Sequence, residues 1–489
     1  MPPPPASPWP LLQLRRVCRL SLDRPASLPV DTRACLFARP QTAKTACFST
    51  SPARWANPSP KKKGLVAAPK RGTRTLNVKR GKRASGQSTA RPPAVGERKA
   101  QRKRVVLSNN NALPVPGLVD LDKSNALSDD IRGHVMGIPD LAVDALRAVD
   151  AFKPTQGWRL FRRPATLIRT ETARLAGLVR DVQAPAEGQA RATVRRILTG
   201  DRLSGKSTLL LQGLAVAWLQ GWVVVNLPEA KDLVNGHTDY APLPGSRPAQ
   251  YTQDTYTASL LSQMVAANSA LFAATRVVTK PTLPVPLPAT ATLKQLAELG
   301  IASPEASWPV FVALWAELTH PGRPPVMLTL DGLSHIMRES DYLSADVKPI
   351  HSHDLTLVRH FVDHLSGKVP LPNGGIVLAA TSTSNAPSSP ALDFSVLLAK
   401  ARARNAHPSH TPTWNPYRVV DQRAMECLAN VDTLNVSGLS KEEARTIMEY
   451  YAQSGLLRAK VDEKLVAEKW SLAGMGNVGE LERTSIRLV

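Results

Sequence analysis

The sequence predicts an α/β fold with a parallel central sheet, followed by a C-terminal helical domain and preceded by a disordered basic tail. Three observations support this prediction. A glycine-rich loop separates a strand-like run from an apolar helix-like run, and three more buried-strand patterns follow along the chain. Almost all of the excess positive charge lies in the first 104 residues.

The charge is concentrated at the N-terminus. The 489-residue chain has a formal net charge of +23. Residues 1–104 hold 24 of the 62 Lys and Arg residues but only 3 of the 39 Asp and Glu residues, a net charge of +21. The remaining residues are nearly neutral, so a partner attracted by positive charge is a partner of this tail.

Residues 1–55 have the composition of a mitochondrial targeting presequence, because they are rich in Arg, Ser and Ala and poor in acids. Residues 11–20 (LLQLRRVCRL) can form a short basic amphipathic helix, and residues 47–55 (CFSTSPARW) resemble the processing region of fungal presequences. The alternative is a merely disordered N-terminus. Removal of the presequence would leave Cys427 as the remaining cysteine, which suits a reducing matrix or cytosol.

Residues 56–115 predict a basic disordered tail. Within it, residues 61–106 space basic clusters with Gly, Pro, Ser and Ala and contain no aromatic residue. Such a segment cannot bury enough apolar area to fold alone, and it lacks the rings that stack on unpaired bases. It suits sequence-independent contact with the phosphate backbone of a large RNA. A solvated linker or an extended presequence is the alternative.

Residues 116–410 predict a nucleotide-binding domain. Its first part, up to residue 190, is expected to be mainly helical, because residues 125–137 and 169–183 carry apolar residues three and four positions apart. A strand at 192–198 and an apolar helix at 207–220 then flank the stretch LTGDRLSGKSTLL.

That stretch matches the phosphate-loop pattern of Gly, any four residues, Gly, Lys, then Ser or Thr. The glycines let backbone N–H groups point at phosphates, Lys206 would reach the terminal phosphates, and the Ser207 hydroxyl would ligate Mg²⁺. The helix that begins here directs its N-terminus at the anion. The predicted phosphate-binding residues are Gly200, Asp201, Arg202, Leu203, Ser204, Gly205, Lys206, Ser207 and Thr208.

Three further runs, at 221–228, 325–332 and 374–385, predict buried strands. The strand at 325–332 contains Asp331 near its end, an acid placed to support the Mg²⁺ ion beside Ser207. The tip of the strand at 374–385 carries Thr381 and Ser382, whose hydroxyls can sense a terminal phosphate or water. The uncharged stretch 207–228 also raises the possibility of a membrane helix. Its glycines and glutamines, and the phosphate loop directly before it, favour a buried helix followed by a strand instead. No membrane span is therefore expected.

Residues 411–489 predict a C-terminal helical domain. Within it, the helix at 440–457 is expected to open with Ser440 as cap and Glu443 at the capping-box position. Four histidines, at positions 351, 353, 360 and 364, raise the possibility of a metal site. The run HFVDH lacks the Glu of a zinc protease and no cysteine lies nearby, which favours a polar, partner-facing helix.

Taken together, four stretches resemble the death-associated-protein family of mitochondrial small-subunit ribosomal proteins in its fungal form, over roughly residues 115–489. They are the phosphate loop, GWVVVNLPEAKDLVNGHTDY (221–240), LTLDGLSHIMRESDY (328–342) and KPIHSHDLTLVRHFVDHLSG (348–367). The resemblance implies a P-loop core of the AAA+ type that binds GTP or GDP with Mg²⁺. It also implies a place in the head of the small subunit in the mitochondrial matrix. The implied contacts are with small-subunit rRNA, neighbouring ribosomal proteins and bridges to the large subunit.

Two departures from active AAA+ enzymes bear on hydrolysis. The Glu that follows the Walker B Asp and polarises water is replaced by Gly332, although Glu229 on a neighbouring strand end is a candidate substitute. Val478 and Gly479 occupy the Pro-Arg positions of the usual GNPRE sensor. The guanine reader Asn-Lys-x-Asp is absent, so ATP is not excluded. We expect a ribosomal protein that holds nucleotide as a structural ligand with slow or no hydrolysis; the alternative is an active NTPase switch or remodelling factor.

Overall fold

A computed structural model describes residues 105–185, 191–288, 290–383, 386–404 and 412–486. These residues belong to one unit, residues 91–489. The predicted presequence 1–55 and all of the predicted basic tail up to residue 104 lie outside the described residues.

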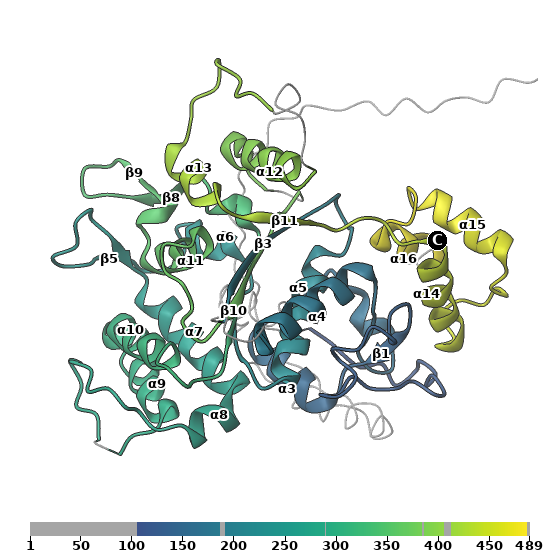
Figure 1. The fold of residues 1–489 in the computed structure, drawn as a ribbon, viewed down its shortest axis with the longest axis horizontal. Coiled ribbons are helices and arrows are strands. Elements are labelled where there is room, and N and C mark those ends of the chain that lie inside the picture. Colours follow the sequence, from purple (N-terminus) through teal and green to yellow (C-terminus); the bar gives the residue numbers. More distant parts are fainter. Residues whose placement is uncertain (1–104, 186–190, 289, 384–385, 405–411, 487–489) are drawn as a thin grey trace, which may run out of the picture. The chain divides into compact units, whose positions relative to one another are not determined.

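Within the described residues, a five-stranded parallel sheet forms the centre of the fold, with strand order β11-β3-β10-β7-β4 (Figure 1). The four predicted strands are all present in it, which confirms the expected α/β fold with a parallel sheet. β4 and β10 are buried along their whole length, as apolar strands covered on both faces should be. The strands are β3 (Thr193–Thr199), β4 (Val223–Leu227), β7 (Val326–Asp331), β10 (Gly375–Ala380) and β11 (Asp432–Asn435).

The fifth strand, β11, lies in the range 411–489 for which only helices were expected. It is four residues long, begins and ends with exposed polar residues, and pairs on one side with β3. Such a short, polar edge strand has no apolar run by which a sequence pattern could reveal it. The sheet therefore extends into the predicted helical domain.

Helices cover both faces of the sheet. On one face lie α3 (Asp140–Ala148), α4 (Thr170–Gln183) and α5 (Lys206–Leu219), which share a buried core with alternate residues of β3, β4 and β10. On the other face lie α7 (Asp254–Ala267), α9 (Leu293–Ala302), α10 (Ser307–Leu318) and α11 (Thr356–Ser366). Both layers are visible edge-on in Figure 1.

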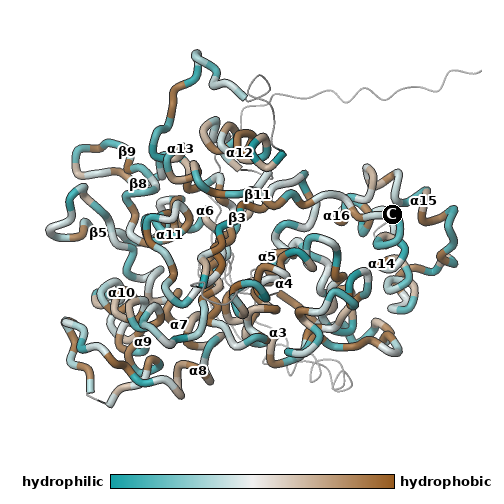
Figure 2. Tube along the Cα trace, viewed as in Figure 1, coloured by the Kyte–Doolittle hydropathy of each residue, from teal (hydrophilic) through white to brown (hydrophobic). Residues whose placement is uncertain are grey.

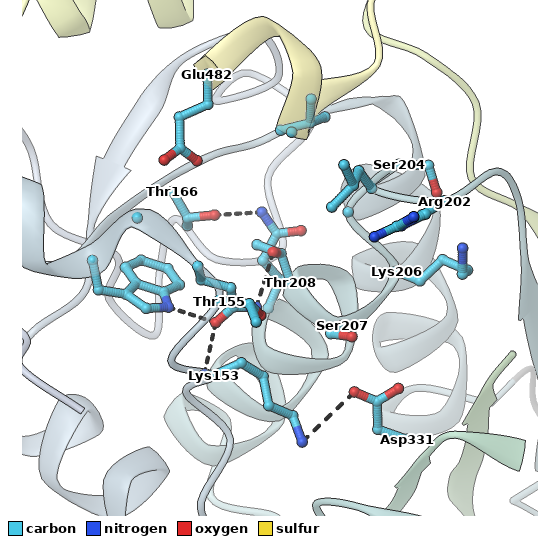
Figure 3. Close-up of a pocket in the computed structure, with 18 of the residues that line it drawn as sticks. Lys153, Thr155, Thr166, Arg202, Ser204, Lys206, Ser207, Thr208, Asp331 and Glu482 are labelled. Atoms are coloured by element: carbon cyan, nitrogen blue, oxygen red, sulfur yellow. Dashed lines mark hydrogen bonds and ion pairs between the residues drawn. The ribbon is translucent and has the colours of Figure 1, made fainter. Parts of the chain in front are cut away.

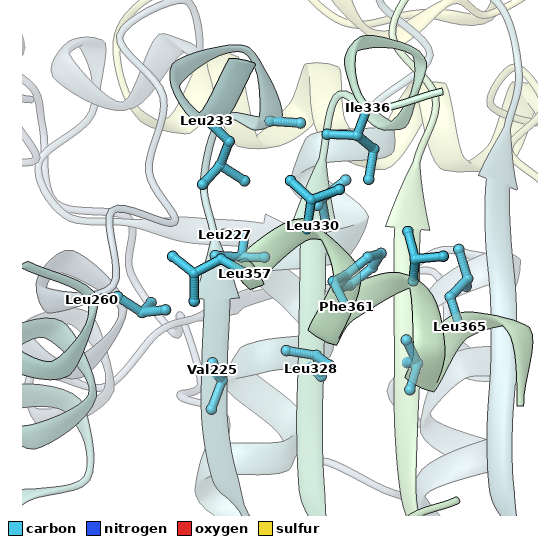
Figure 4. Packing of buried hydrophobic residues seen from close by; sticks show 14 of the residues in the cluster. Val225, Leu227, Leu233, Leu260, Leu328, Leu330, Ile336, Leu357, Phe361 and Leu365 are labelled. Atoms are coloured by element: carbon cyan, nitrogen blue, oxygen red, sulfur yellow. The ribbon is translucent and has the colours of Figure 1, made fainter. Parts of the chain in front are cut away.

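Helix α11 shows how the second layer is packed. Leu357, Phe361 and Leu365 recur every four residues and are all buried, so they form one face of the helix. In Figure 4 the helix crosses in front of β7 and β10, and Leu328 and Leu330 of β7 belong to the same buried cluster. Burial of each such side chain contributes about 1.5–3 kcal/mol, which fixes the helix on the sheet.

The C-terminal helices have a small core of their own. They are α14 (Lys441–Gln453), α15 (Glu463–Leu472) and α16 (Val478–Ser485). Their buried residues pack together with Leu167 of the short strand β2 (Ala165–Leu167). The predicted capping box is confirmed, because the Ser440 hydroxyl accepts from the Glu443 N–H and the Glu443 carboxylate accepts from the Ser440 N–H.

The prediction of a helix at 125–137 is wrong. This stretch forms turns and ends in β1 (Val135–Gly137), which pairs with β2. The left-handed Gly133 donates its N–H to the Ile168 carbonyl, a bond that a continuing helix would not allow. The other predicted helix in this region, 169–183, is confirmed as α4.

Apart from the 14-residue α12 (Pro390–Ala403), the remaining elements are short and mostly peripheral. Figure 2 colours the central strands and much of α5 as hydrophobic, whereas hydrophilic stretches mark the outer hairpins. No helix of the described residues is long and apolar enough to cross a membrane. These elements are η1 (Gly157–Leu160), α6 (Ala230–Val234), β5 (Ala241–Pro242), β6 (Tyr251–Thr252), α8 (Ser269–Ala274), η2 (Pro304–Ala306), η3 (Leu333–His335), β8 (Glu339–Leu343), β9 (Pro349–His351), η4 (Ser352–Asp354), α12 (Pro390–Ala403) and α13 (Gln422–Leu428).

Candidate functional site

The predicted phosphate loop connects the carboxyl end of β3 to the first turn of α5. Gly200 has φ 153°, and a Cβ there would lie 2.3 Å from the Val436 carbonyl oxygen, so a larger residue does not fit. Gly205 caps α5 in the left-handed conformation, with φ 95°. The first backbone N–H groups of α5 therefore lie at the N-terminal end of the helix and have no hydrogen-bond partners within it. Such an arrangement is chemically suited to an anion.

The Lys206 side chain folds back onto its own loop. Its Nζ donates to the carbonyls of Gly200 at 2.9 Å and Asp201 at 2.6 Å, and only 8% of the residue is exposed. Burial lowers the pKa of Lys206, while the carboxylates of Asp331 and Asp201 favour its charged form. The ammonium therefore lies inside the loop, where phosphates would meet it.

The sheet register brings the other predicted residues to the same edge. Ala380 of β10 pairs with both Leu198 of β3 and Asp331 of β7, so these strands end at one level. Thr381 follows directly, and its hydroxyl donates to the Leu198 carbonyl at 3.0 Å. Each predicted site residue from Arg202 to Thr208, together with Asp331 and Thr381, lines one cavity of about 620 Å³, and Gly200 and Asp201 form its loop (Figure 3).

The predicted Mg²⁺ ligands fit that ion chemically. The Ser207 hydroxyl and the Asp331 carboxylate are hard oxygen donors, and both line the cavity. No group of three or more His, Cys, Asp or Glu residues that could hold a metal occurs among the described residues. An ion here would take its other ligands from phosphate and water, as Mg²⁺ usually does.

Three residues before β2 belong to the cavity but were missed in the sequence. Lys153 Nζ lies 3.7 Å from Asp331 Oδ2. Gln156 Nε2 donates to Thr208 Oγ1 at 3.2 Å, and Trp158 Nε1 donates to Gln156 Oε1 at 2.5 Å. The segment 153–158 follows no motif and no period, so only the three-dimensional arrangement connects it with the phosphate loop.

A buried ion pair attaches the phosphate loop to the segment after β11. Arg169 is 5% exposed and donates from Nε to Glu171 at 2.8 Å, from Nη1 to the Ser204 carbonyl at 2.9 Å and from Nη2 to the Ser437 carbonyl. Burial raises the pKa of Glu171, but hydrogen bonds from Ser437 and the Arg169 charge outweigh it and lower that pKa. The paired charges hold two distant segments together.

Helix α16 closes the cavity from the C-terminal side. The Gly479 N–H donates to the Leu203 carbonyl at 3.1 Å, and Asn477 Nδ2 donates to the Arg202 carbonyl at 2.7 Å. A Cβ on Gly479 would lie 2.8 Å from the Leu203 Cβ. The position of the usual sensor arginine is thus filled by direct contact between α16 and the loop.

The end of the cavity away from Asp331 is apolar and aromatic. The Phe161 ring lies 5.1 Å from the Tyr450 ring and 5.7 Å from the Tyr451 ring, measured between centroids. The Glu482 carboxylate also lines the cavity: a Cβ on Gly157 would lie 2.4 Å from its Oε1, and Figure 3 shows Glu482 on the side opposite Asp331. The apolar end is lined by Val135, Phe161, Leu167, Leu439, Ile447, Tyr450 and Tyr451.

The four histidines are not arranged as a metal site. His353 is buried, which lowers its pKa to about 3. His360 is also buried, with a pKa of about 3, and packs edge-on against Trp315 at 4.4 Å between ring centroids. His353 and His360 are therefore neutral side chains packed within the fold.

The family model described as mitochondrial ribosomal death-associated protein 3 matches residues 166–484. A Neurospora crassa protein described as small ribosomal subunit protein mS29 is 43% identical over 416 residues, which cover 84% of this chain and 87% of that protein. The Schizosaccharomyces pombe protein of the same description is 28% identical over 140 residues, 29% of this chain and 26% of that protein. Among solved structures, the Aeropyrum pernix ORC2 protein matches with a TM-score of 0.31 and 13% identity, over 64% of this chain and 60% of that one.

The match of the family model and the Neurospora relative both span most of the chain, and they agree with the resemblance found in the sequence. The expected location, the ribosome of the mitochondrial matrix, is confirmed with it. The chain therefore belongs to the family of mitochondrial ribosomal death-associated protein 3.

Proposed function

We propose that this member of the family is a structural protein of the mitochondrial small ribosomal subunit that holds a guanine nucleotide with Mg²⁺. The observation that carries the proposal is the single cavity of about 620 Å³ that contains Lys206, Ser207 and Asp331 at one end and an apolar, aromatic surface at the other. This volume is typical of sites for small molecules. The phosphates would bind at the loop, and the base at the apolar end.

A P-loop core of the AAA+ type is part of the proposal. Its support is the parallel strand order, in which β3 carries the loop, β10 lies between β3 and β7, and the acid Asp331 ends β7. Ligands of open parallel sheets bind beyond the carboxyl ends of the strands, which is where the cavity lies.

The guanine part of the proposal rests on the resemblance found in the sequence, and the Glu482 carboxylate, which lines the same cavity, is chemically suited to that base. Guanine presents two adjacent N–H donors on its pairing edge, which match the two oxygens of a carboxylate, whereas adenine presents one amino group. Sites built to bond such donors reject bases that lack them. GTP and GDP are thus the proposed ligands.

Slow or absent hydrolysis is supported by three positions. Gly332, which follows Asp331, has no carboxylate and adopts a left-handed φ of 88°. Glu229, the candidate substitute, lies 3.9 Å from the Lys153 ammonium. Gly479 leaves no space for a sensor arginine against Leu203. An activated water is therefore not supplied by these positions.

A nucleotide held without chemistry would still stabilise the fold. The cavity is lined by the phosphate loop, by residues 153–169 and by α14 and α16, so one ligand would bridge all three. A ligand that binds only the folded state adds about 4 kcal/mol when its concentration is a thousand times Kd.

Contacts with small-subunit rRNA, neighbouring ribosomal proteins and a bridge to the large subunit complete the proposal. Their support is family membership and the sequence of the basic tail, of which residues 56–104 lie outside the described residues. Clustered Lys and Arg suit binding to the phosphate backbone of RNA.

The proposal is tested by purifying the small subunit from mitochondria, releasing bound nucleotide with acid, and identifying and counting it by chromatography. We expect about one GTP or GDP per subunit, unexchanged over hours, as for a trapped ligand. Substoichiometric nucleotide that exchanges quickly, or protein mostly off the ribosome, would instead support the switch or remodelling NTPase. The intact Lys206 and Ser207 are the observation that keeps this second function in view.

A further inference from the structure

Lys153 brings a second ammonium to the phosphate end of the cavity. Its Nζ lies 3.7 Å from Asp331 Oδ2 and 3.9 Å from Glu229 Oε1, and it donates to the Pro228 carbonyl. The side chain is 14% exposed. Figure 3 shows it reaching toward Asp331 from below the loop, while Lys206 lies on the other side of Ser207.

The backbone of Lys153 is fixed against α5. Its N–H donates to Gln156 Oε1 at 2.9 Å, and Gln156 Nε2 donates to Thr208 Oγ1 at 3.2 Å. Thr208 belongs to the first turn of the helix that follows the phosphate loop. The position of the ammonium is therefore set by the same turn that would bind phosphate.

Lys153 and a magnesium ion would neutralise the same charges. Asp331 is the carboxylate that would support the ion, and it is already within ion-pair distance of Lys153. The Lys153 ammonium and a Mg²⁺ ion would repel each other, so the presence of one reduces the free energy gained by binding the other. Lys206, by contrast, contacts the loop carbonyls of Gly200 and Asp201.

We propose that Lys153 is a phosphate-binding residue that supplies part of the charge usually supplied by Mg²⁺, so that nucleotide is retained with little dependence on that ion. The inference rests on the proposed nucleotide-binding function. It explains why an ammonium is held at the one carboxylate of β7 that faces the phosphate end.

The test measures the Kd of the purified full chain for fluorescent GDP, in excess Mg²⁺ and in excess EDTA. For the wild-type chain we expect the two values to differ by less than about threefold, because a charge-assisted contact replaces the ion. For Lys153→Met we expect the value in EDTA to be weaker by about tenfold or more.

Two variants separate charge from structure. Lys153→Arg keeps the positive charge and should keep the wild-type ratio of the two Kd values. Lys464→Met removes an exposed lysine of α15 that does not line the cavity, and should also keep that ratio. Thermal melts of the nucleotide-free proteins check that each variant folds.

A structural role of Lys153 would weaken binding equally in Mg²⁺ and EDTA, and that outcome would overturn the inference. A wild-type chain that loses nucleotide by a hundredfold or more in EDTA would overturn it as well. If the wild-type chain binds no nucleotide in either buffer, the proposed function itself fails. The three outcomes are distinguishable in one titration series.

Discussion

At the residue scale, Lys206 is the side chain on which the proposed phosphate binding most depends. We expect Lys206→Ala to abolish nucleotide retention and to lower the amount of assembled small subunit, because the substitution removes the ammonium enclosed by the loop carbonyls. The nucleotide content and the sedimentation profile of mitochondrial subunits check this. Lys294→Ala is the control, because Lys294 is a half-exposed lysine that pairs with Glu298 and does not line the cavity. Normal assembly with an empty cavity would contradict a structural role for the ligand.

His353 and His360 predict a loss of stability in mild acid. Both have a folded pKa of about 3, below the ordinary value of 6.5, because burial disfavours the charged ring. The unfolded chain therefore binds more protons between these values, so the stabilisation is complete above pH 6.5 and is lost as pH falls toward 3. Each histidine costs up to about 1.4 kcal/mol per pH unit in that window.

The measurement is the thermal melting temperature at pH 7.5 and pH 5. His360→Phe keeps a ring against Trp315 and removes one titrating group, so its melting temperature should fall less on acidification. His237→Asn, at an exposed position, should behave as the wild-type chain. Equal pH dependence in the wild-type chain and His360→Phe would show that the ring does not control acid stability.

Residues of the site differ in how far the sequence reveals them. Gly200 to Thr208 are contiguous, and their types and spacing follow from the needs of a phosphate, so the loop is predictable as a unit. Lys153 approaches Asp331 only because the segment before β2 folds against α5 through Gln156. That contact joins distant parts of the chain without any repeated pattern, and it was therefore missed.

At the element scale, α16 packs directly against the phosphate loop in the cavity wall. We expect Gly479→Ala to destabilise the fold by about 1–3 kcal/mol, because its Cβ would lie 2.8 Å from that of Leu203. It should also weaken nucleotide binding by displacing the loop. Chemical denaturation and the nucleotide Kd report the two effects.

Gly177→Ala is the matched control for this substitution. Gly177 lies within α4, and its Cβ would meet only the Arg180 guanidinium at 3.8 Å. Alanine there should stabilise the helix by about 0.5–1 kcal/mol. If both alanines proved neutral, α16 would not be packed against Leu203 as described.

Elements were predictable in proportion to their apolar content. β4, β7 and β10 are buried on both faces and read as continuous apolar runs, so the sequence reveals them. β11 is a polar edge strand, and residues 125–137 have helical spacing but are drawn into turns and β1 by hydrogen bonds such as that of Gly133. Tertiary pairing there overrides the local pattern.

At the scale of the whole molecule, the cavity joins the sheet to the C-terminal helices. We expect GDP to slow tryptic cleavage within residues 441–485 by about tenfold, because a bound ligand opposes local opening of these helices. Cleavage is followed by mass spectrometry with and without nucleotide. Lys206→Ala should be cleaved at the same rate in both conditions, and protection of that variant would place the ligand elsewhere.

The hydrogen bond from Asn477 to the Arg202 carbonyl spans 275 positions of the chain. A protein imported into mitochondria crosses the membranes in extended form, with its N-terminus leading. The phosphate loop would thus reach the matrix well before α16, and its cavity would stay open on one side during translocation. The proposed nucleotide capture would then be a late step of import, and it would mark the chains that have arrived far enough to join a ribosome.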